Sequence, residues 1–216
     1  MPAKHIVLIG PPGAGKSTVA HAIAALLTVR IVSTGMLLRS EIAAGTARGR
    51  EIAAAIDQGN LVSDAMMHAV LADHVAQFDA AEGLILDGYP RTLSQAAHLP
   101  ALLASYGRTL DLVALIDIRD DEAVRRLSGR RMCVTATDTF PVHVDEPTTI
   151  ADCQRRGGTL VQRPDDAPEV IQHRVDVYHA TTAPLIAHFH QLGMLQRVDG
   201  AQPAPAVARQ IVEYCQ

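Results

Sequence analysis

Short apolar runs alternate along the chain with longer stretches in which apolar residues recur every three to four positions. The runs are rich in Val, Ile and Leu, which predicts strands at His5–Ile9, Arg30–Ser33, Leu84–Asp87, Leu112–Ile118 and Leu195–Val198. The longer stretches predict helices at Lys16–Thr28, Met36–Ala44, Arg48–Gln58, Asp64–Phe78, Leu93–Tyr106, Asp120–Arg130, Pro168–His190 and Pro205–Tyr214. Continuously apolar strands separated by helices indicate an α/β fold, in which helices cover both faces of a parallel sheet.

A glycine-rich turn lies between the first predicted strand and the first predicted helix. It reads Gly10-Pro-Pro-Gly-Ala-Gly-Lys16-Ser17 and matches the phosphate-binding pattern G-x-x-x-x-G-K-S/T in the context that this pattern requires. Its backbone N–H groups and the start of the following helix would face a phosphate. The turn therefore predicts a P-loop fold that binds a nucleoside triphosphate and Mg²⁺ through Gly13, Ala14, Gly15, Lys16, Ser17 and Thr18.

Composition and charge exclude several other classes. The net charge of −4, 3% aromatic residues and absence of Trp argue against nucleic acid as the main partner. No apolar run reaches the roughly 20 residues of a membrane helix, and the N-terminal residues lack the pattern of a signal peptide. Only three cysteines are present, which favours the cytoplasm over a secreted disulfide scaffold. Because no Lys follows Lys16, the Asn-Lys-x-Asp guanine-binding motif of GTPases is absent.

One segment, residues 131–166, interrupts the alternation of strands and helices. It shows no helical period and mixes β-branched residues with turn residues. We therefore predict a small β-rich insertion, and long insertions of this kind often act as lids.

Three further segments follow the glycine-rich turn in order: Ser33–Arg39, Leu86–Thr92 and Gly129–Arg131. Together with that turn they closely resemble the adenylate kinases of the nucleoside monophosphate kinase family. The block Asp-Gly-Tyr-Pro-Arg-Thr is typical of this family, whereas the glycine-rich turn alone is not. The resemblance extends over nearly the whole chain, through Gln58–Val62, Arg163–Asp166, Tyr178–Leu185 and Val198–Gly200.

The resemblance implies a reaction and a domain organisation. The family transfers a phosphoryl group from Mg·ATP to AMP and releases two ADP. A monomer is expected, with a five-stranded core from residues 1–33, 74–130 and 167–216, a helical AMP-binding subdomain at 34–73 and a lid at 131–166. No general base is assigned, because phosphoryl transfer depends mainly on positioning and electrostatics.

The resemblance also assigns roles to individual residues. Asp87 would hold Mg²⁺ through water, Arg39 and Arg91 would bind the acceptor phosphate, and Thr34 and Gln95 would read adenine. The arginines expected around the donor phosphates and adenine are Arg126, Arg130, Arg163 and Arg174; of these, Arg163 and Arg174 are also expected to contact the phosphates shared with AMP. The rest of the AMP side would consist of Gly35, Asn60, Leu61, Val62 and Gly88, the last of which lets the backbone approach the base.

Two departures from the family pattern leave alternatives open. Of four zinc-ligand positions in the lid, only Cys133 and Cys153 carry cysteine, while Ala136 and Arg156 occupy the others. Structural zinc needs four ligands, so we expect none. We expect the two cysteines to pack as small apolar residues; a disulfide between them stays open, although a reducing compartment disfavours it. Met36 stands where the family usually has Asp. Together with the missing lid ligands it motivates a catalytically weak nucleotide sensor as an alternative to an active adenylate kinase. A kinase for another nucleoside monophosphate also stays open, because the fold alone does not determine the acceptor.

Overall fold

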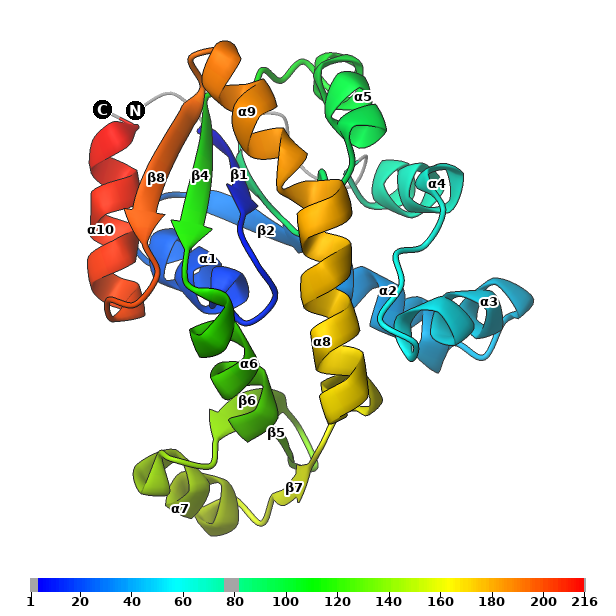
Figure 1. Cartoon of the computed structure of the whole chain (residues 1–216), viewed down its shortest axis with the longest axis vertical. Helices are drawn as coiled ribbons and strands as arrows, with labels where there is room; N and C mark the ends of the chain where they lie inside the picture. Colours follow the sequence, from blue (N-terminus) through cyan, green and yellow to red (C-terminus); the bar gives the residue numbers. More distant parts are fainter. Residues whose placement is uncertain (1–3, 76–81, 216) are drawn as a thin grey trace.

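The computed structural model describes residues 4–75 and 82–215. A five-stranded sheet forms its centre (Figure 1), with the order β2 (Val29–Ser33), β3 (Gly83–Asp87), β1 (His5–Ile9), β4 (Leu112–Asp117) and β8 (Leu195–Asp199). Every neighbouring pair in this sheet is parallel. The predicted α/β fold is confirmed, and each strand end lies within one residue of its predicted position.

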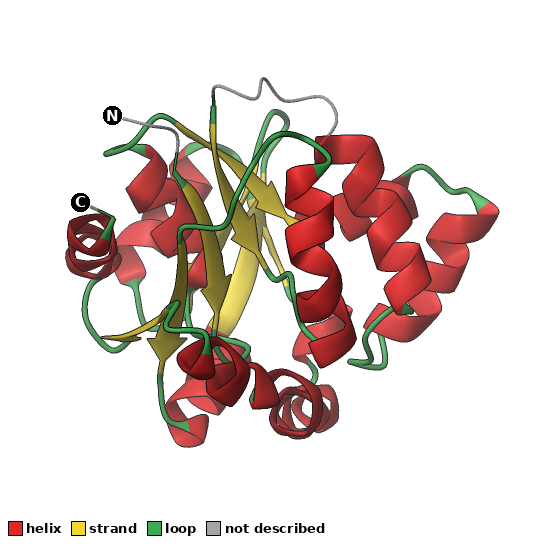
Figure 2. Ribbon diagram, turned by 90° about the horizontal axis from the view of Figure 1, so that it is seen from above, coloured by secondary structure: helices red, strands yellow, loops and turns green. Residues whose placement is uncertain are grey.

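Helices cover both faces of the sheet (Figure 2). Successive side chains of β1 point to opposite faces, so Ile6 and Leu8 join one buried cluster while Val7 and Ile9 join the other. The first cluster is completed by α1 (Lys16–Ala24) and α10 (Ala204–Tyr214). The second is completed mainly by α4 (Asp64–Val75), α5 (Leu93–Ala104) and α9 (Pro184–Gln191). Burial of both faces explains why the strands read as continuous apolar runs.

Two smaller units extend from this core (Figure 1). After β2 the chain forms α2 (Thr34–Ala43) and α3 (Ala47–Ile56) and then enters α4. After α6 (Asp120–Gly129) it forms an antiparallel sheet of order β6–β5–β7, and α8 (Pro168–Val177) leads back to the core. The strands of this second sheet are β5 (Arg130–Val134), β6 (Thr139–His143) and β7 (Thr159–Val161).

Three predictions about helices differ from the structure. The insertion contains a helix, α7 (Pro147–Arg155), although its sequence shows no helical period. The predicted helix Pro168–His190 is not continuous, because a π-helical segment, η2 (Tyr178–Thr182), separates α8 from α9. The end of the predicted helix Asp64–Phe78 lies outside the described residues, and α4 is described to Val75. Predicted Lys16–Thr28 is too long, since α1 ends at Ala24.

The two lid cysteines form the disulfide that the sequence left open and that a reducing compartment disfavours. Cys133 on β5 and Cys153 on α7 form a disulfide with a Cα–Cα distance of 5.8 Å. Both residues are fully buried and pack with Val142, Phe140 and Leu160 in a small apolar cluster. The bridge therefore joins the helix of the insertion to its sheet, and it leaves neither sulfur free to bind a metal.

We expect reduction of this bridge to destabilise the insertion. The bridged cysteines are 20 residues apart, and closing a loop of that length constrains the unfolded chain by about 3 kcal/mol. Dithiothreitol should therefore lower the midpoint of thermal unfolding of the wild type, but not that of a Cys133→Ala, Cys153→Ala double variant. Thiol titration in denaturant without reductant should give one free thiol, Cys215; finding all three cysteines reactive would contradict the bridge.

Candidate active site

A cavity of about 1530 Å³ opens between the core, the α2–α4 segment and the insertion. It exceeds the roughly 300–1,000 Å³ of a pocket for one small ligand, so it has room for two nucleotides. It lies at the carboxyl ends of the parallel strands, where ligands of such sheets bind. Every residue predicted as a site residue lines it: Gly13, Ala14, Gly15, Lys16, Ser17, Thr18, Thr34, Gly35, Arg39, Asn60, Leu61, Val62, Asp87, Gly88, Arg91, Gln95, Arg126, Arg130, Arg163 and Arg174.

The glycine-rich turn follows β1 closely and ends in the first turn of α1. Gly10 has a φ of +147°, and a Cβ there would lie 2.3 Å from the carbonyl oxygen of Ile116 on β4. Only glycine therefore allows the turn to leave the sheet at this point. Beyond it, the Lys16 Nζ donates hydrogen bonds of 2.8 Å to the carbonyl oxygens of Gly10 and Pro11. The Lys16 ammonium is thus held by the first residues of the glycine-rich turn.

Burial strongly affects the charge on Lys16. Loss of solvation lowers the pKa of its ammonium group to about 7, although the carboxylate of Asp87 partly opposes this shift. Arg91 and Arg174 lower the pKa of Lys16 further. A bound polyphosphate would supply the negative charge that this position lacks.

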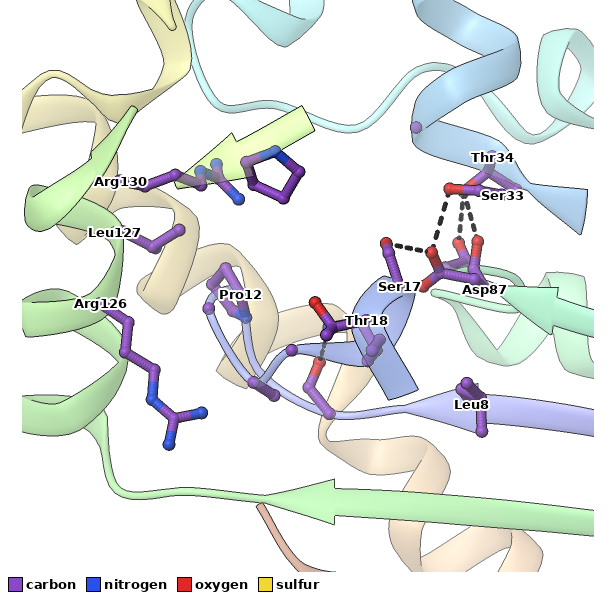
Figure 3. Close-up of a pocket in the computed structure, with 18 of the residues that line it drawn as sticks. Leu8, Pro12, Ser17, Thr18, Ser33, Thr34, Asp87, Arg126, Leu127 and Arg130 are labelled. Carbon is purple, nitrogen blue, oxygen red and sulfur yellow. Dashed lines mark hydrogen bonds between the residues drawn. The ribbon is translucent and has the colours of Figure 1, made fainter. Parts of the chain in front are cut away.

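Asp87 lies at the end of β3 and accepts two hydroxyl hydrogen bonds on one carboxylate oxygen (Figure 3). The Ser17 Oγ donates to Oδ2 at 2.5 Å, and the Ser33 Oγ donates to the same atom at 3.0 Å. Carboxylate and hydroxyl oxygens are hard ligands of the kind that Mg²⁺ binds. The residues present therefore fit a magnesium site. Sequence reasoning did not include Ser33, although it directly precedes the predicted Thr34.

Gly88 follows Asp87 and brings the backbone close to α2. Its φ is +84°, and a Cβ would lie 2.6 Å from the Thr34 Oγ1 and 3.0 Å from the Arg91 Nη2. The Thr34 hydroxyl lies against the carbonyl oxygens of Asp87 and Gly88, at 3.2 and 3.1 Å. The absence of a side chain at residue 88 thus keeps the predicted base-reading threonine and phosphate-binding arginine beside one another.

Three of the predicted arginines converge on two adjacent aspartates. Arg130 pairs with Asp166 through two hydrogen bonds of 2.8 and 2.6 Å, and Arg163 pairs with Asp165 in the same way. The Arg174 Nη1 donates to the Asp165 carbonyl at 2.8 Å and to the Asp166 Oδ1 at 3.0 Å. Both aspartates are buried. They hold the guanidinium groups in fixed positions at the junction of the insertion and α8.

The two aspartates were missed as functional residues. The segment Arg163-Pro-Asp-Asp166 is part of the family resemblance. Its adjacent basic and acidic residues could have indicated that the aspartates hold arginine side chains in the site. Burial raises the pKa of Asp165, but Arg174 and Arg163 more than offset this effect, so its pKa lies below the usual value.

Loss of solvation and neighbouring cations lower the pKa of two arginines in the cavity. Burial lowers the pKa of Arg39 to about 10, and the neighbouring Arg163 lowers it further while Asp165 opposes the shift. Burial likewise lowers the pKa of Arg174 to about 10. The Arg91 guanidinium donates through Nε to the carbonyl oxygen of Gly88 at 2.9 Å. These positive groups, brought together from distant segments, form an environment that favours anions.

Arg126 near the end of α6 and Arg130, the first residue of β5, lie on the side of the cavity next to the glycine-rich turn (Figure 3). The Arg126 side chain is held by Glu122 at 2.6 Å and by the carbonyl oxygen of Gly200 at 3.0 Å. Hydrogen bonds from Arg125 and Arg126 lower the pKa of Glu122 to about 2. This side of the cavity therefore also presents fixed cations near the turn.

The model of the adenylate kinase family matches residues 8–194 of the chain. The chain belongs to the adenylate kinase family. It is 42% identical to an adenylate kinase of Acidothermus cellulolyticus, over 96% of this chain and 95% of that protein. It is 40% identical to one of Symbiobacterium thermophilum over 97% of each chain, and 41% identical to one of Salinispora tropica over 96% of each chain.

Family membership confirms the predicted enzyme class. This adenylate kinase family member is a phosphotransferase of the nucleoside monophosphate kinase type, and transfer from ATP to AMP is the activity that its relatives support. The alternative of a catalytically weak sensor is not favoured. Among residues 4–75 and 82–215, no helix is long and apolar enough to cross a membrane.

Proposed function

We propose that the cavity binds ATP and AMP end to end and transfers the γ-phosphoryl group of ATP to the AMP phosphate, giving two ADP. This proposal rests on one observation: the glycine-rich turn and arginines from separate segments of the chain line the same cavity. The triphosphate lies on the turn, beside Lys16, Arg126 and Arg130. The acceptor lies beside α2 and the segment before α4, and its phosphate faces Arg39 and Arg91.

The transfer needs positioned charge rather than a base. An anionic oxygen of the AMP phosphate attacks the γ-phosphorus, and the bond to the β,γ-bridging oxygen breaks with its electrons left on ADP. Because the nucleophile already carries negative charge, no proton has to be removed from it. Lys16, Arg130, Arg163 and Arg174 face the oxygens on which charge is spread in the transition state.

The magnesium ion that accompanies ATP in this family fits the same side of the cavity. Ser17, Thr18 and Asp87 would hold it, the last through water, and when bound it would neutralise charge on the β- and γ-phosphate oxygens. The carboxylate of Asp87 is already oriented for this task by Ser17 and Ser33.

We propose that residues 34–73 and 131–166 close over the two substrates as separate units. Closure would exclude water, which otherwise competes with AMP as phosphoryl acceptor. On the acceptor side Thr34, Gly88, Gln95 and residues 60–62 would surround the adenine.

A coupled assay tests this assignment directly. The protein is given Mg·ATP with AMP, CMP, UMP or GMP in turn, and ADP formation is followed. We expect turnover with AMP and much weaker turnover with the other three. Turnover with a different acceptor would make the chain a kinase for that nucleotide. ATP binding without turnover on any acceptor would instead support a sensor. We further propose a cytoplasmic monomer, for which light scattering should give a mass near 23.1 kDa.

Met36 offers a prediction about the acceptor side. Its side chain is 58% exposed in the first turn of α2, lines the cavity, and lies one helical turn before Arg39. Met36→Asp would place a carboxylate beside Arg39 and at a helix N-terminus, where it stabilises by about 0.3–1 kcal/mol. We expect kcat/KM for AMP to rise several-fold, on the order of this energy. Met36→Asn serves as the uncharged control, and an equal gain in that variant would contradict the role of charge.

A further inference from the structure

Gln95 is the buried amide expected to read the acceptor base, and its orientation is held by two partners of opposite chemistry. Its Nε2 donates to the Asp64 Oδ1 at 2.7 Å, and its Oε1 accepts from the Arg91 backbone N–H at 2.7 Å. An ionised carboxylate only accepts hydrogen bonds, and a backbone N–H only donates them. Exchanging the amide oxygen and nitrogen would therefore break both bonds and bring like groups together.

Asp64 is tied into this arrangement by a second contact. It is the first residue of α4, and its carboxylate lies 3.2 and 3.3 Å from the hydroxyl of Thr92. The same hydroxyl accepts a 3.1 Å hydrogen bond from the backbone N–H of Gln95 and so caps α5. The carboxylate thus reaches from the α2–α4 segment to the start of a core helix and is bound there at two points.

The two held contacts determine what Gln95 has left for a ligand. The Nε2 group has two hydrogens, one of which is donated to Asp64. The Oε1 has two lone pairs, one of which accepts the Arg91 N–H. One donor and one acceptor remain, in fixed order. A 6-aminopurine presents an acceptor at N1 and a donor at its amino group, which matches this order. A 6-oxopurine presents a donor at N1 and an acceptor at O6, which opposes it.

We propose that Asp64 is a positioning residue that prevents the side-chain amide of Gln95 from flipping. It thereby sets the specificity of the enzyme for 6-aminopurine over 6-oxopurine acceptor nucleotides. This inference rests on the proposed reading of adenine by Gln95. Asp64 contacts no base itself; it acts through the amide. In the flipped orientation the Gln95 Nε2 would face the Arg91 N–H on one side, and the Gln95 Oε1 would face the Asp64 carboxylate on the other. Each partner therefore disfavours the flip separately.

The test compares AMP with IMP, because hypoxanthine differs from adenine only at position 6 and in the proton on N1. We expect Asp64→Ala to lower the ratio of kcat/KM for AMP to that for IMP by about 10-fold or more, the effect of losing one hydrogen bond to a charged group. The change should lie in the KM for AMP and not in the KM for ATP. Asp64→Asn retains an oxygen that accepts from the Gln95 Nε2, so this variant should keep most of the wild-type ratio.

Two further variants make the outcome decisive. Glu51→Ala removes an exposed carboxylate from α3 in the same segment and should leave the ratio at the wild-type value. Gln95→Ala should abolish the preference. If Gln95→Ala loses the preference and Asp64→Ala retains it, the role of Asp64 is wrong while adenine reading by Gln95 stands. If Gln95→Ala retains it as well, the reading of adenine by Gln95 fails and the present inference fails with it.

Discussion

Lys16→Met should lower kcat/KM by about 10²–10³-fold, the loss typical of removing one preorganised charge from a transition state. The Lys16 side chain is partly buried, and its ammonium donates hydrogen bonds to the carbonyl oxygens of its own turn. It is therefore in place before substrate arrives. Steady-state kinetics with ATP and AMP varied separately measures the loss, and full turnover in the variant would remove Lys16 from the phosphate site.

The same variant should be more stable than the wild type when no nucleotide is present. Burial lowers the pKa of Lys16 from 10.5 in the unfolded chain to about 7 in the folded protein. Between these values the unfolded chain binds one more proton, so wild-type stability rises with pH across this window. Below pH 7 both states are protonated and the full cost of a buried ammonium remains. Lys16→Met lacks that cost.

Unfolding midpoints measured at pH 6 and near pH 10 test this expectation. The gain of Lys16→Met over the wild type should be largest at pH 6 and should shrink as the pH rises. Lys4→Met is a matched control, because Lys4 and Lys16 are the two lysines of the chain. A comparable pH-dependent gain in Lys4→Met would show that the effect does not come from the phosphate site.

The central sheet could be predicted closely because its strands are buried on both faces. Continuous runs such as Leu112–Ile116 leave no polar face, and they are too short to be buried helices. The helix α7 gave no such signal. Of its residues only Cys153 is buried, so there is no apolar stripe to detect. The π-helical segment Tyr178–Thr182 was hidden for the opposite reason, since helical spacing continues on both sides of it.

The candidate site was predictable where its residues are contiguous or belong to a recognised block. The glycine-rich turn is one short segment whose conformation depends on its own glycines. Contacts between distant segments left no comparable signal. Asp64 and Gln95 are 31 residues apart, and Arg130 and Asp166 are 36 apart. The sequence shows that these side chains exist, but only folding determines which carboxylate meets which amide or guanidinium group. The pairing of Cys133 with Cys153 was left open for the same reason.

Arg91→Ala should reduce kcat/KM for AMP by about 10²-fold, because the proposed charge-assisted contact of its guanidinium with the acceptor phosphate would be lost. Binding of ATP, measured by calorimetry, should change little. Arg91→Lys should recover only part of the loss, since an ammonium cannot reproduce the planar fork of a guanidinium. Arg48→Ala, which breaks an exposed pair with Glu41 on the same side of the molecule, should have almost no effect. Equal losses for AMP and ATP would contradict the acceptor assignment.

The backbone and the side chain of Arg91 have different expected roles, one in the preference between AMP and IMP and the other in affinity for the acceptor. Its N–H holds the Gln95 amide, and its carbonyl oxygen accepts a 2.9 Å hydrogen bond from the Thr182 hydroxyl in the π-helical segment. Neither contact involves the guanidinium group, so Arg91→Ala leaves both in place. We therefore expect this variant to lose affinity for AMP and IMP alike while its preference between them is kept. Asp64→Ala should show the opposite pattern, with preference lost and phosphate binding retained. If Arg91→Ala also loses the preference, the phosphate and base contacts of the acceptor cannot be independent.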